Sequence, residues 1–322
     1  MFPLPGRSEI EQIAPLIDGF VPPTPQFSWP LLNARTGCEL WVKHENHTAI
    51  GSFKIRGAVA YLARLREREP ATGVIAATRG NFGQAVAFAA TRQGFTATVV
   101  APHGNNPEKN RAMRALGAEL IEHGADFQAA IEHSIVLARE RGLHAMPSFH
   151  RDLVLGNAVS ALHFLKNAPA LDAVYVPIGL GSGICALAAA REALGLPTRL
   201  IGVASTAAPG IALSFASRQL TAHPATTRIA DGMACSTPHP DALALILKHV
   251  ERIVTVTDDE VEAAIRIYFS DTHNIAEGAA AAALAAVLQD RAHVSGRRIG
   301  IVCSGGNIDT PTFARLLAAS SA

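Results

Sequence analysis

The sequence lacks an excess of charge of either sign. It carries 28 Lys and Arg side chains against 27 Asp and Glu, so its formal net charge is +1. A protein that binds nucleic acid through phosphate contacts usually has a basic excess, and we therefore expect no nucleic-acid partner. Disordered chains have too few apolar residues to form a core, whereas 49% of this chain is hydrophobic. These values predict a folded protein of roughly two domains.

Long apolar runs and cysteines are also scarce. No stretch reaches the roughly 18–20 uninterrupted apolar residues that a membrane-spanning helix needs. Residues 1–19 do not combine a basic cluster with an apolar segment, as a secretion signal would. The four cysteines lie far apart in the sequence, which favours reduced, buried thiols over disulfides. We therefore expect a cytoplasmic protein with no membrane segment.

Short apolar segments alternate with helical ones along most of the chain. Strands that alternate with helices in this way predict βαβ units and parallel sheets. We expect a small α/β domain at residues 73–147, inserted into a large domain that comprises residues 1–72 and 148–322. The expected strands lie at residues 39–43, 74–77, 97–101, 119–121, 173–176, 200–204, 252–256 and 298–303.

Three of the expected strands end in glycine-containing turns, at residues 78–83, 179–183 and 304–307. Ligands of open parallel sheets bind at such strand ends. The middle turn is the best candidate for an anion, because glycines let backbone N–H groups converge before the N-terminus of a helix. Ile184 stands where a dinucleotide-binding loop has its last glycine, and the Gly-Lys-Ser/Thr of a nucleotide loop is missing. The turn therefore favours a single compact phosphate, with a purely structural turn as the alternative.

Lys54 has unusual neighbours for a helix lysine. Phe53 and Ile55 are apolar, and Gly51 and Gly57 leave room around the side chain. An amine in apolar surroundings loses its charge more easily and becomes a nucleophile. A solvent-exposed lysine on a helix is the ordinary alternative.

The segment Ser52-Phe53-Lys54-Ile55-Arg56-Gly57-Ala58 resembles the lysine motif of fold-type II pyridoxal-phosphate enzymes, in the threonine/serine dehydratase family. The resemblance covers about residues 20–310. It implies an α/β, tryptophan synthase β-like fold, in which two open parallel-sheet, three-layer domains hold the cofactor in the cleft. Further matching blocks occur in the family's order: Gly80-Asn81 with residues 84–87, Lys109–Glu119, the loop after Pro177, Ala230-Asp231-Gly232, Glu277-Gly278-Ala279 and residues 304–309.

The resemblance also implies pyridoxal 5′-phosphate as the cofactor and a role for each matching residue. Lys54 would bind the cofactor covalently and later move the Cα proton. Phe53 would flank the pyridine ring, Asn81 would bond its 3′-oxygen and Ser304 its nitrogen. The phosphate would be held by Gly179, Leu180, Gly181, Ser182 and Gly183. The substrate carboxylate would lie on the backbone of Thr78, Arg79, Gly80, Asn81 and Phe82.

The implied reaction is α,β-elimination, in which a β-hydroxy-α-amino acid of the threonine or serine type yields a 2-oxo acid and ammonia. The neutral hydroxyl of Ser304 does not enforce a protonated pyridine, which favours prompt loss of a leaving group. The same chemistry on phenylserine or 3-hydroxyaspartate is the close alternative. A β-replacement synthase is less expected, because residues 78–82 do not match the Thr-Ser-Gly-Asn-Thr loop of that class. A non-catalytic cofactor-binding protein is the last alternative, and a homodimer is compatible with all of them.

Several positions depart from the family pattern. Arg79 replaces a serine that acts on the opposite face in racemases, and since arginine stays protonated we expect no racemisation. Arg79 then grips the substrate carboxylate or the cofactor phosphate, or it points to solvent. Phe82 replaces a histidine and permits a larger β-substituent, and Ala204 replaces the glutamate of metal-binding members, so we expect no metal. Asn157 and His163 depart in a segment that lines the substrate side in the family.

Overall fold

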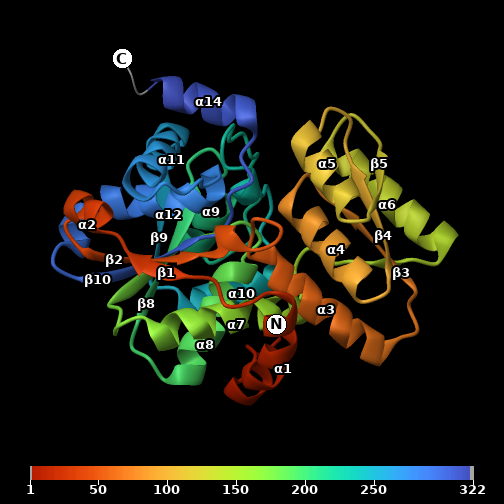
Figure 1. Ribbon diagram of the computed structural model, residues 1–322, viewed down its shortest axis with the longest axis horizontal. Helices are drawn as coiled ribbons and strands as arrows, with labels where there is room; N and C mark the ends of the chain where they lie inside the picture. The colour runs from red at the N-terminus through yellow and green to blue at the C-terminus, as the bar shows by residue number, and fades with distance from the viewer. Residues whose placement is uncertain (1, 320–322) are drawn as a thin grey trace.

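A computed structural model describes residues 2–319 of the chain and contains two β-sheets. A six-stranded sheet has the order β1-β2-β10-β7-β8-β9, and a four-stranded sheet has the order β5-β4-β3-β6. We call the six-stranded sheet with its helices the large part, and the four-stranded sheet with its helices the small part. Figure 1 shows the small part on the right and the large part on the left. Within residues 2–319, no helix is long and apolar enough to cross a membrane.

All neighbouring strands of the large part are parallel except β1, which pairs antiparallel with β2 at the edge. Alternate residues of β7 enter different hydrophobic clusters: Val174 lies in one and Tyr175 in the other. Because strand side chains alternate between faces, both faces of this sheet are covered. The strands are β1 (Gln26–Ser28), β2 (Glu39–His44), β7 (Ala173–Pro177), β8 (Arg199–Ser205), β9 (Arg252–Val256) and β10 (Arg298–Cys303).

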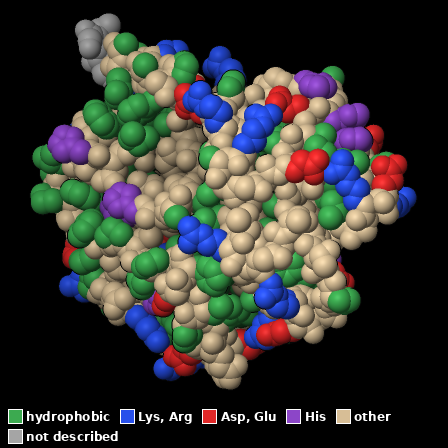
Figure 2. All heavy atoms as spheres, turned by 45° about the vertical axis from the view of Figure 1, so that its right-hand side comes forward, with side chains coloured by type: hydrophobic (Ala, Val, Ile, Leu, Met, Phe, Trp, Pro, Cys, Tyr) green, Lys and Arg blue, Asp and Glu red, His purple; other side chains and the backbone are tan. Residues whose placement is uncertain are grey.

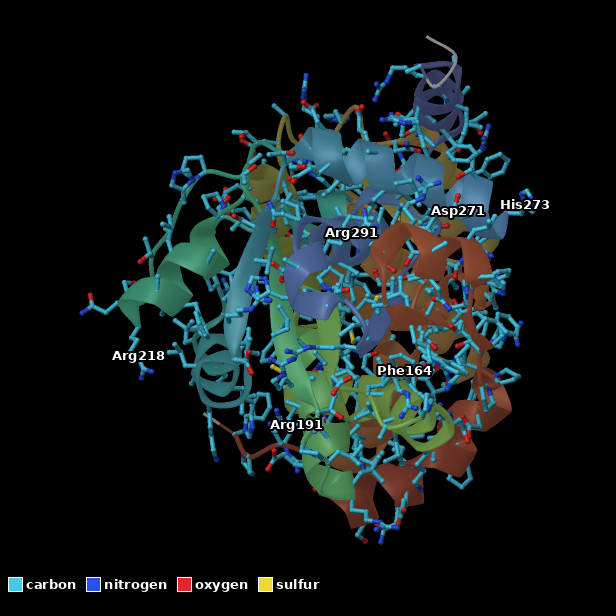
Figure 3. The ribbon with its side chains drawn as sticks, turned by 90° about the vertical axis from the view of Figure 1, so that its left-hand side faces the viewer. Phe164, Arg191, Arg218, Asp271, His273 and Arg291 are labelled. Carbon is cyan, nitrogen blue, oxygen red and sulfur yellow. The ribbon has the colours of Figure 1, made fainter. Side chains whose placement is uncertain are left out.

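Helices α7 (Arg151–Asn167) and α8 (Ser182–Leu194) cover one face of this sheet, and α11 (Asp258–Thr272) and α12 (Gly278–Gln289) cover the other. Phe164, labelled in Figure 3, lies so near the sheet that a Cβ on Gly300 would be 3.0 Å from its ring. The other elements of the large part are α1 (Arg7–Phe20), α2 (Pro30–Thr36), η1 (Glu45–His47), α3 (Lys54–Arg68), α9 (Gly210–Ser217), η2 (Asp231–Met233), α10 (Pro240–His249), α13 (Arg291–Val294) and α14 (Thr310–Ala318).

The small part contains an all-parallel sheet whose four strands come from one continuous stretch of chain. Its elements are β3 (Gly73–Ala77), α4 (Asn81–Arg92), β4 (Thr96–Ala101), α5 (Pro107–Ala115), β5 (Glu119–Glu122), α6 (Phe127–Arg141) and β6 (His144–Ala145). This stretch falls inside residues 73–147. The exact domain limits stay a prediction, because α3 packs against both α4 and α7.

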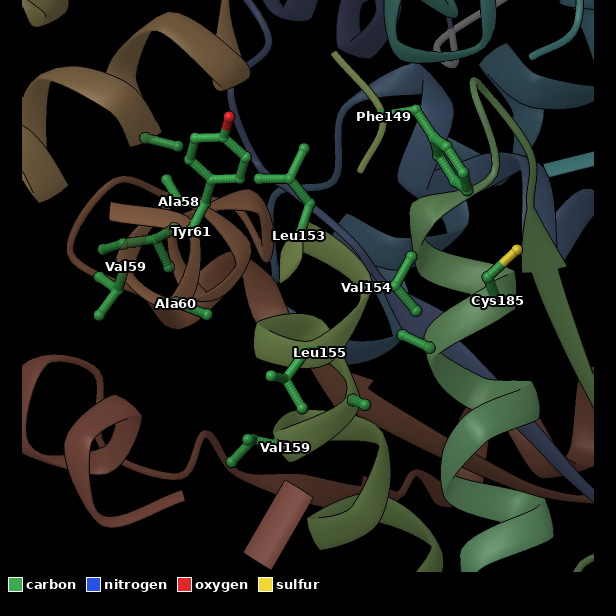
Figure 4. Packing of buried hydrophobic residues seen from close by; sticks show 14 of the residues in the cluster. Ala58, Val59, Ala60, Tyr61, Phe149, Leu153, Val154, Leu155, Val159 and Cys185 are labelled. Atoms are coloured by element: carbon green, nitrogen blue, oxygen red, sulfur yellow. The ribbon is translucent and has the colours of Figure 1, made fainter. Parts of the chain in front are cut away.

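Figure 4 shows where α3 packs on α7: Tyr61 lies near Leu153 of α7, and Cys185 of α8 lies beyond. Ala60 is completely buried, and a Cβ on Gly156 of α7 would lie 2.7 Å from the Ala60 Cβ. Short side chains let the helices approach closely, so α3 is held firmly at its packing face. Lys54 is the first residue of this helix.

Candidate functional site

The turn that carries Lys54 is tied to the end of β10. The Phe53 N–H donates to the Ser304 carbonyl at 3.0 Å, and Ser52 forms a β-bridge with Gly305. The Lys54 amine lies 5.1 Å from the centre of the Phe53 ring. The structure thus brings together Phe53, Lys54 and Ser304, although Phe53 and Ser304 are 251 residues apart in the sequence.

The surroundings of Lys54 favour its neutral form. Burial lowers the pKa of Lys54, and the charge of Lys109 acts in the same direction, while the Glu277 carboxylate and Cys235 oppose the shift. A lower pKa raises the fraction of neutral amine, which is the nucleophilic and proton-accepting form. This is the environment that the apolar neighbours in the sequence predicted.

The glycine loop before α8 has the backbone that a compact anion requires. A Cβ on Gly179 would lie 2.3 Å from the Gly232 carbonyl oxygen, so only glycine fits there. Gly181 has a φ of 104°, in the region that favours glycine. A Cβ on Gly183 would lie 3.5 Å from the Phe53 ring.

The 13-residue helix α8 begins at Ser182, and its first N–H groups have no partner within the helix. Such a terminus attracts a phosphate. Phe53, Gly183 and Ser304 also line one small cavity of about 40 Å³, which extends toward the buried Arg56 and Glu45 and does not include Lys54. The glycine loop and the helix terminus therefore fit the phosphate of pyridoxal phosphate, with Leu180 completing the predicted loop.

Asn81 begins α4 and connects the small part to the large one. Its amide nitrogen donates to Glu277 at 2.7 Å, and its amide oxygen accepts a hydrogen bond of 2.8 Å from Asn307. The second N–H of the Asn81 amide is the one that remains for a ligand. Sequence reasoning missed the roles of Glu277 and Asn307, although both lie in blocks that match the family pattern.

The substrate loop, defined as residues 78–82, follows β3. Thr78 is buried, and its hydroxyl accepts a 3.3 Å hydrogen bond from the Gly80 N–H. Phe82 packs against the main hydrophobic cluster. Arg79 instead is exposed, and its guanidinium lies 5.6 Å from the centre of the Phe127 ring of α6. Its contact with a substrate stays a prediction.

Two further predicted positions lie away from this group. Asn157 accepts a hydrogen bond of 3.0 Å from the Gly57 N–H, behind the lysine turn. His163 lies 3.4 Å from Asp18 of α1. An influence of this segment on substrate choice stays a prediction. In residues 2–319, no group of three or more His, Cys, Asp or Glu side chains is arranged to hold a metal.

Comparisons with known proteins agree on one enzyme family. Residues 17–305 match the family model described as pyridoxal-phosphate dependent enzyme. The L-threonine ammonia-lyase of Thermotoga maritima is 33% identical over 288 residues, 89% of this chain and 72% of that protein. The L-threo-3-hydroxyaspartate ammonia-lyase of a Pseudomonas species is 30% identical over 315 residues, 98% of this chain and 99% of that protein.

The fold comparison gives the same result. The processed form of threonine deaminase isoform 2 from Solanum lycopersicum superposes with a TM-score of 0.90 at 26% identity, over 99% of this chain and 95% of that one. This match confirms the predicted α/β class with parallel sheets.

Proposed function

Because the chain belongs to the pyridoxal-phosphate dependent enzyme family, we propose that it is an ammonia-lyase that dehydrates a β-hydroxy-α-amino acid to a 2-oxo acid and ammonia. The observation that carries the proposal is the position of Lys54, a half-buried side chain with a lowered pKa beside Ser304 and Phe53. Relatives named for threonine and for 3-hydroxyaspartate support this reaction class. Threonine and serine are the first substrates to test, with 3-hydroxyaspartate and phenylserine next.

When bound, pyridoxal phosphate supplies an electron sink that eases loss of the proton from the substrate Cα. The glycine loop and the N-terminus of α8 would hold the phosphate, and Asn81 would hydrogen-bond the 3′-oxygen. Ser304 would offer a neutral hydroxyl to the pyridine nitrogen. The N–H groups of the substrate loop, at the N-terminus of α4, bind the substrate carboxylate.

Lys54 then acts as the base. Its neutral Nζ accepts the Cα proton. Burial lowers the pKa of Lys54 and so increases the fraction of neutral amine that is ready to accept this proton. The same nitrogen then gives this proton to the β-hydroxyl, which leaves as water. One water later adds back, and the amino group is released as ammonia.

The decisive experiment measures 2-oxo acid release from threonine, serine, phenylserine and 3-hydroxyaspartate by the wild-type protein and by Lys54→Ala. We expect release from at least one substrate, and none from Lys54→Ala. Borohydride reduction and peptide mapping should place the cofactor on Lys54. Full activity of Lys54→Ala, or labelling of another lysine, would overturn the proposal.

We also propose that the protein is a homodimer. Exposed apolar side chains gather where α2 packs against α11: Leu31 is 58% exposed and Phe27 46%. Phe269 and Ile275 extend this surface on either side of His273, which projects at the end of α11 in Figure 3. Large exposed apolar patches are typical of protein–protein contacts.

Light scattering tests the dimer. Phe27→Asp should give a monomer, whereas Ile135→Asp on α6 of the small part should not change the mass. A monomeric wild-type protein would refute the dimer.

We further propose a cytoplasmic location, because all four cysteines are free and a reducing compartment keeps them so. Fractionation of cells that express the chain tests this.

A further inference from the structure

Two consecutive residues of α5 reach from the small part to the large part. The Lys109 amine lies 3.0 Å from the Asp231 carboxylate of η2. The neighbouring Glu108 carboxylate accepts a hydrogen bond of 3.2 Å from the Thr310 N–H, at the start of α14. Lys109 and Asp231 belong to two blocks that match the family pattern but have no role in the chemistry above. Their meeting joins chain segments 122 residues apart.

The Lys109 side chain also lies across the substrate loop. A Cβ on Gly80 would be 3.1 Å from Lys109 Cδ and 3.7 Å from its Nζ. The Lys109 side chain is accordingly only 15% exposed, although its partner Asp231 is 63% exposed. The lysine therefore packs its stem on the loop while its charged end bonds the opposite part.

In the large part, Asp231 is directly followed by Gly232, whose carbonyl oxygen packs against Gly179 of the glycine loop. The Lys109–Asp231 pair thus links the loop expected to bind the substrate carboxylate with the loop expected to bind the cofactor phosphate. The charge of Lys109 also contributes to the lowered pKa of Lys54. The Lys109 side chain therefore contacts both the substrate loop and the large part, and its charge acts on the reactive amine.

Figure 2 shows a face of the molecule on which basic and acidic side chains are interspersed. Charge on such a surface acts through specific pairs rather than through one large field, and exposed pairs weaken as salt rises. The exposure of Asp231 places the Lys109–Asp231 pair in this salt-sensitive class.

We propose that Lys109 is a positioning residue: through its ion pair with Asp231 it holds the substrate loop against the large part, in a contact that salt loosens. The kinetic part of this proposal rests on the proposed function and deepens it. The structural part concerns the chain alone and is tested separately.

Hydrogen–deuterium exchange on the full-length protein, with and without added pyridoxal phosphate, tests the structural part. Lys109→Met and Asp231→Asn should each raise the exchange of residues 78–82 by about twofold to fivefold, the scale of a weak surface pair. The wild-type exchange should rise with salt, whereas that of both variants should not. Lys109→Arg should retain protection and salt dependence.

Arg114→Met is the matched control. It removes an exposed ion pair of 2.9 Å, between Arg114 of the same helix and Glu122, which does not leave the small part. This control should leave the exchange of residues 78–82 unchanged. Equal protection in wild type and Lys109→Met, at low and at high salt, would overturn the proposal.

Steady-state kinetics test the positioning role. Lys109→Met should raise KM about twofold to fivefold with a smaller change in kcat, since the loop that binds the carboxylate is loosened. The exchanged pair Lys109→Asp with Asp231→Lys should recover part of the loss relative to Lys109→Asp alone, and no recovery would refute the ion pair. If no β-hydroxy amino acid is turned over but the exchange results hold, the proposed function fails and the positioning contact stands.

Discussion

The reactive lysine and the substrate loop are held by contacts of different kinds. On the lysine side, the Arg56 side chain is completely buried two residues beyond Lys54. Its guanidinium donates to Glu45 at 2.8 Å and to the Val21 carbonyl at 2.9 Å. Glu45 is itself buried and accepts a further hydrogen bond from Ser160 at 2.5 Å. The first turn of α3 is thus fixed by charges that have no access to water.

On the loop side, the contacts are fewer and closer to solvent. Asn81 bonds Glu277 and Asn307, and Lys109 pairs with the largely exposed Asp231. Water and salt compete with such contacts, whereas they do not reach Arg56. Local opening therefore costs less free energy on the loop side. The difference gives the site a fixed nucleophile and an adjustable substrate-binding loop.

The largest effect should come from breaking the buried pair. Arg56→Met leaves the Glu45 carboxylate buried without its partner, and we expect the free energy of unfolding to fall by about 3–5 kcal/mol. Urea denaturation followed by circular dichroism measures this. Arg114→Met, which breaks an exposed pair, should change it by about 1 kcal/mol or less. Similar losses in both variants would remove the distinction between the two sides.

A smaller effect should follow from crowding the glycine loop. Gly179→Ala places a Cβ against the Gly232 carbonyl oxygen, and overpacking of about 1–3 kcal/mol corresponds to a loss of cofactor affinity of roughly 10–100-fold. Absorbance titration with pyridoxal phosphate measures the affinity. Gly19→Ala in α1, where no atom lies within 4 Å of the new Cβ, is the control. Unchanged affinity in Gly179→Ala would show that this loop also adjusts.

The smallest effect concerns the charge that connects the two sides. The Glu277 carboxylate raises the pKa of Lys54 against the effect of burial, so Glu277→Gln should lower that pKa further. Since the neutral amine takes up the cofactor, uptake by cofactor-free protein should reach its midpoint at lower pH. Stopped-flow absorbance across pH measures this midpoint. Glu122→Gln should leave it in place, and a shift to higher pH would contradict the assigned sign.

The sequence predicted eight of the ten strands in residues 2–319, because short apolar segments leave a local signal. It also proposed a common site for Phe53, Lys54 and Ser304, which the structure brings together. Helix α7 was not predicted, since residues 152–162 are buried on all sides and show no alternation of polar and apolar faces. The edge strands β1 and β6 were also missed, because three and two residues carry too little pattern. The Asn81–Glu277 and Lys109–Asp231 contacts depend on how the two parts close on each other, which no local pattern records. Arg79 illustrates the same limit, since a residue after a strand can point to either side.

Seven of the twelve residues of helix α12 are alanine, and residues 280–283 are fully buried. Glu277 directly precedes this helix, and a Cβ on Gly278 would lie 2.1 Å from the Ile229 carbonyl oxygen. The segment that ends at Asp231 and the carboxylate beside Lys54 therefore share one tightly packed support. An added methylene deep in α12 would move both charges at once. A core substitution at these alanines, far from the reacting atoms, should therefore alter the pH dependence of the reaction at Lys54.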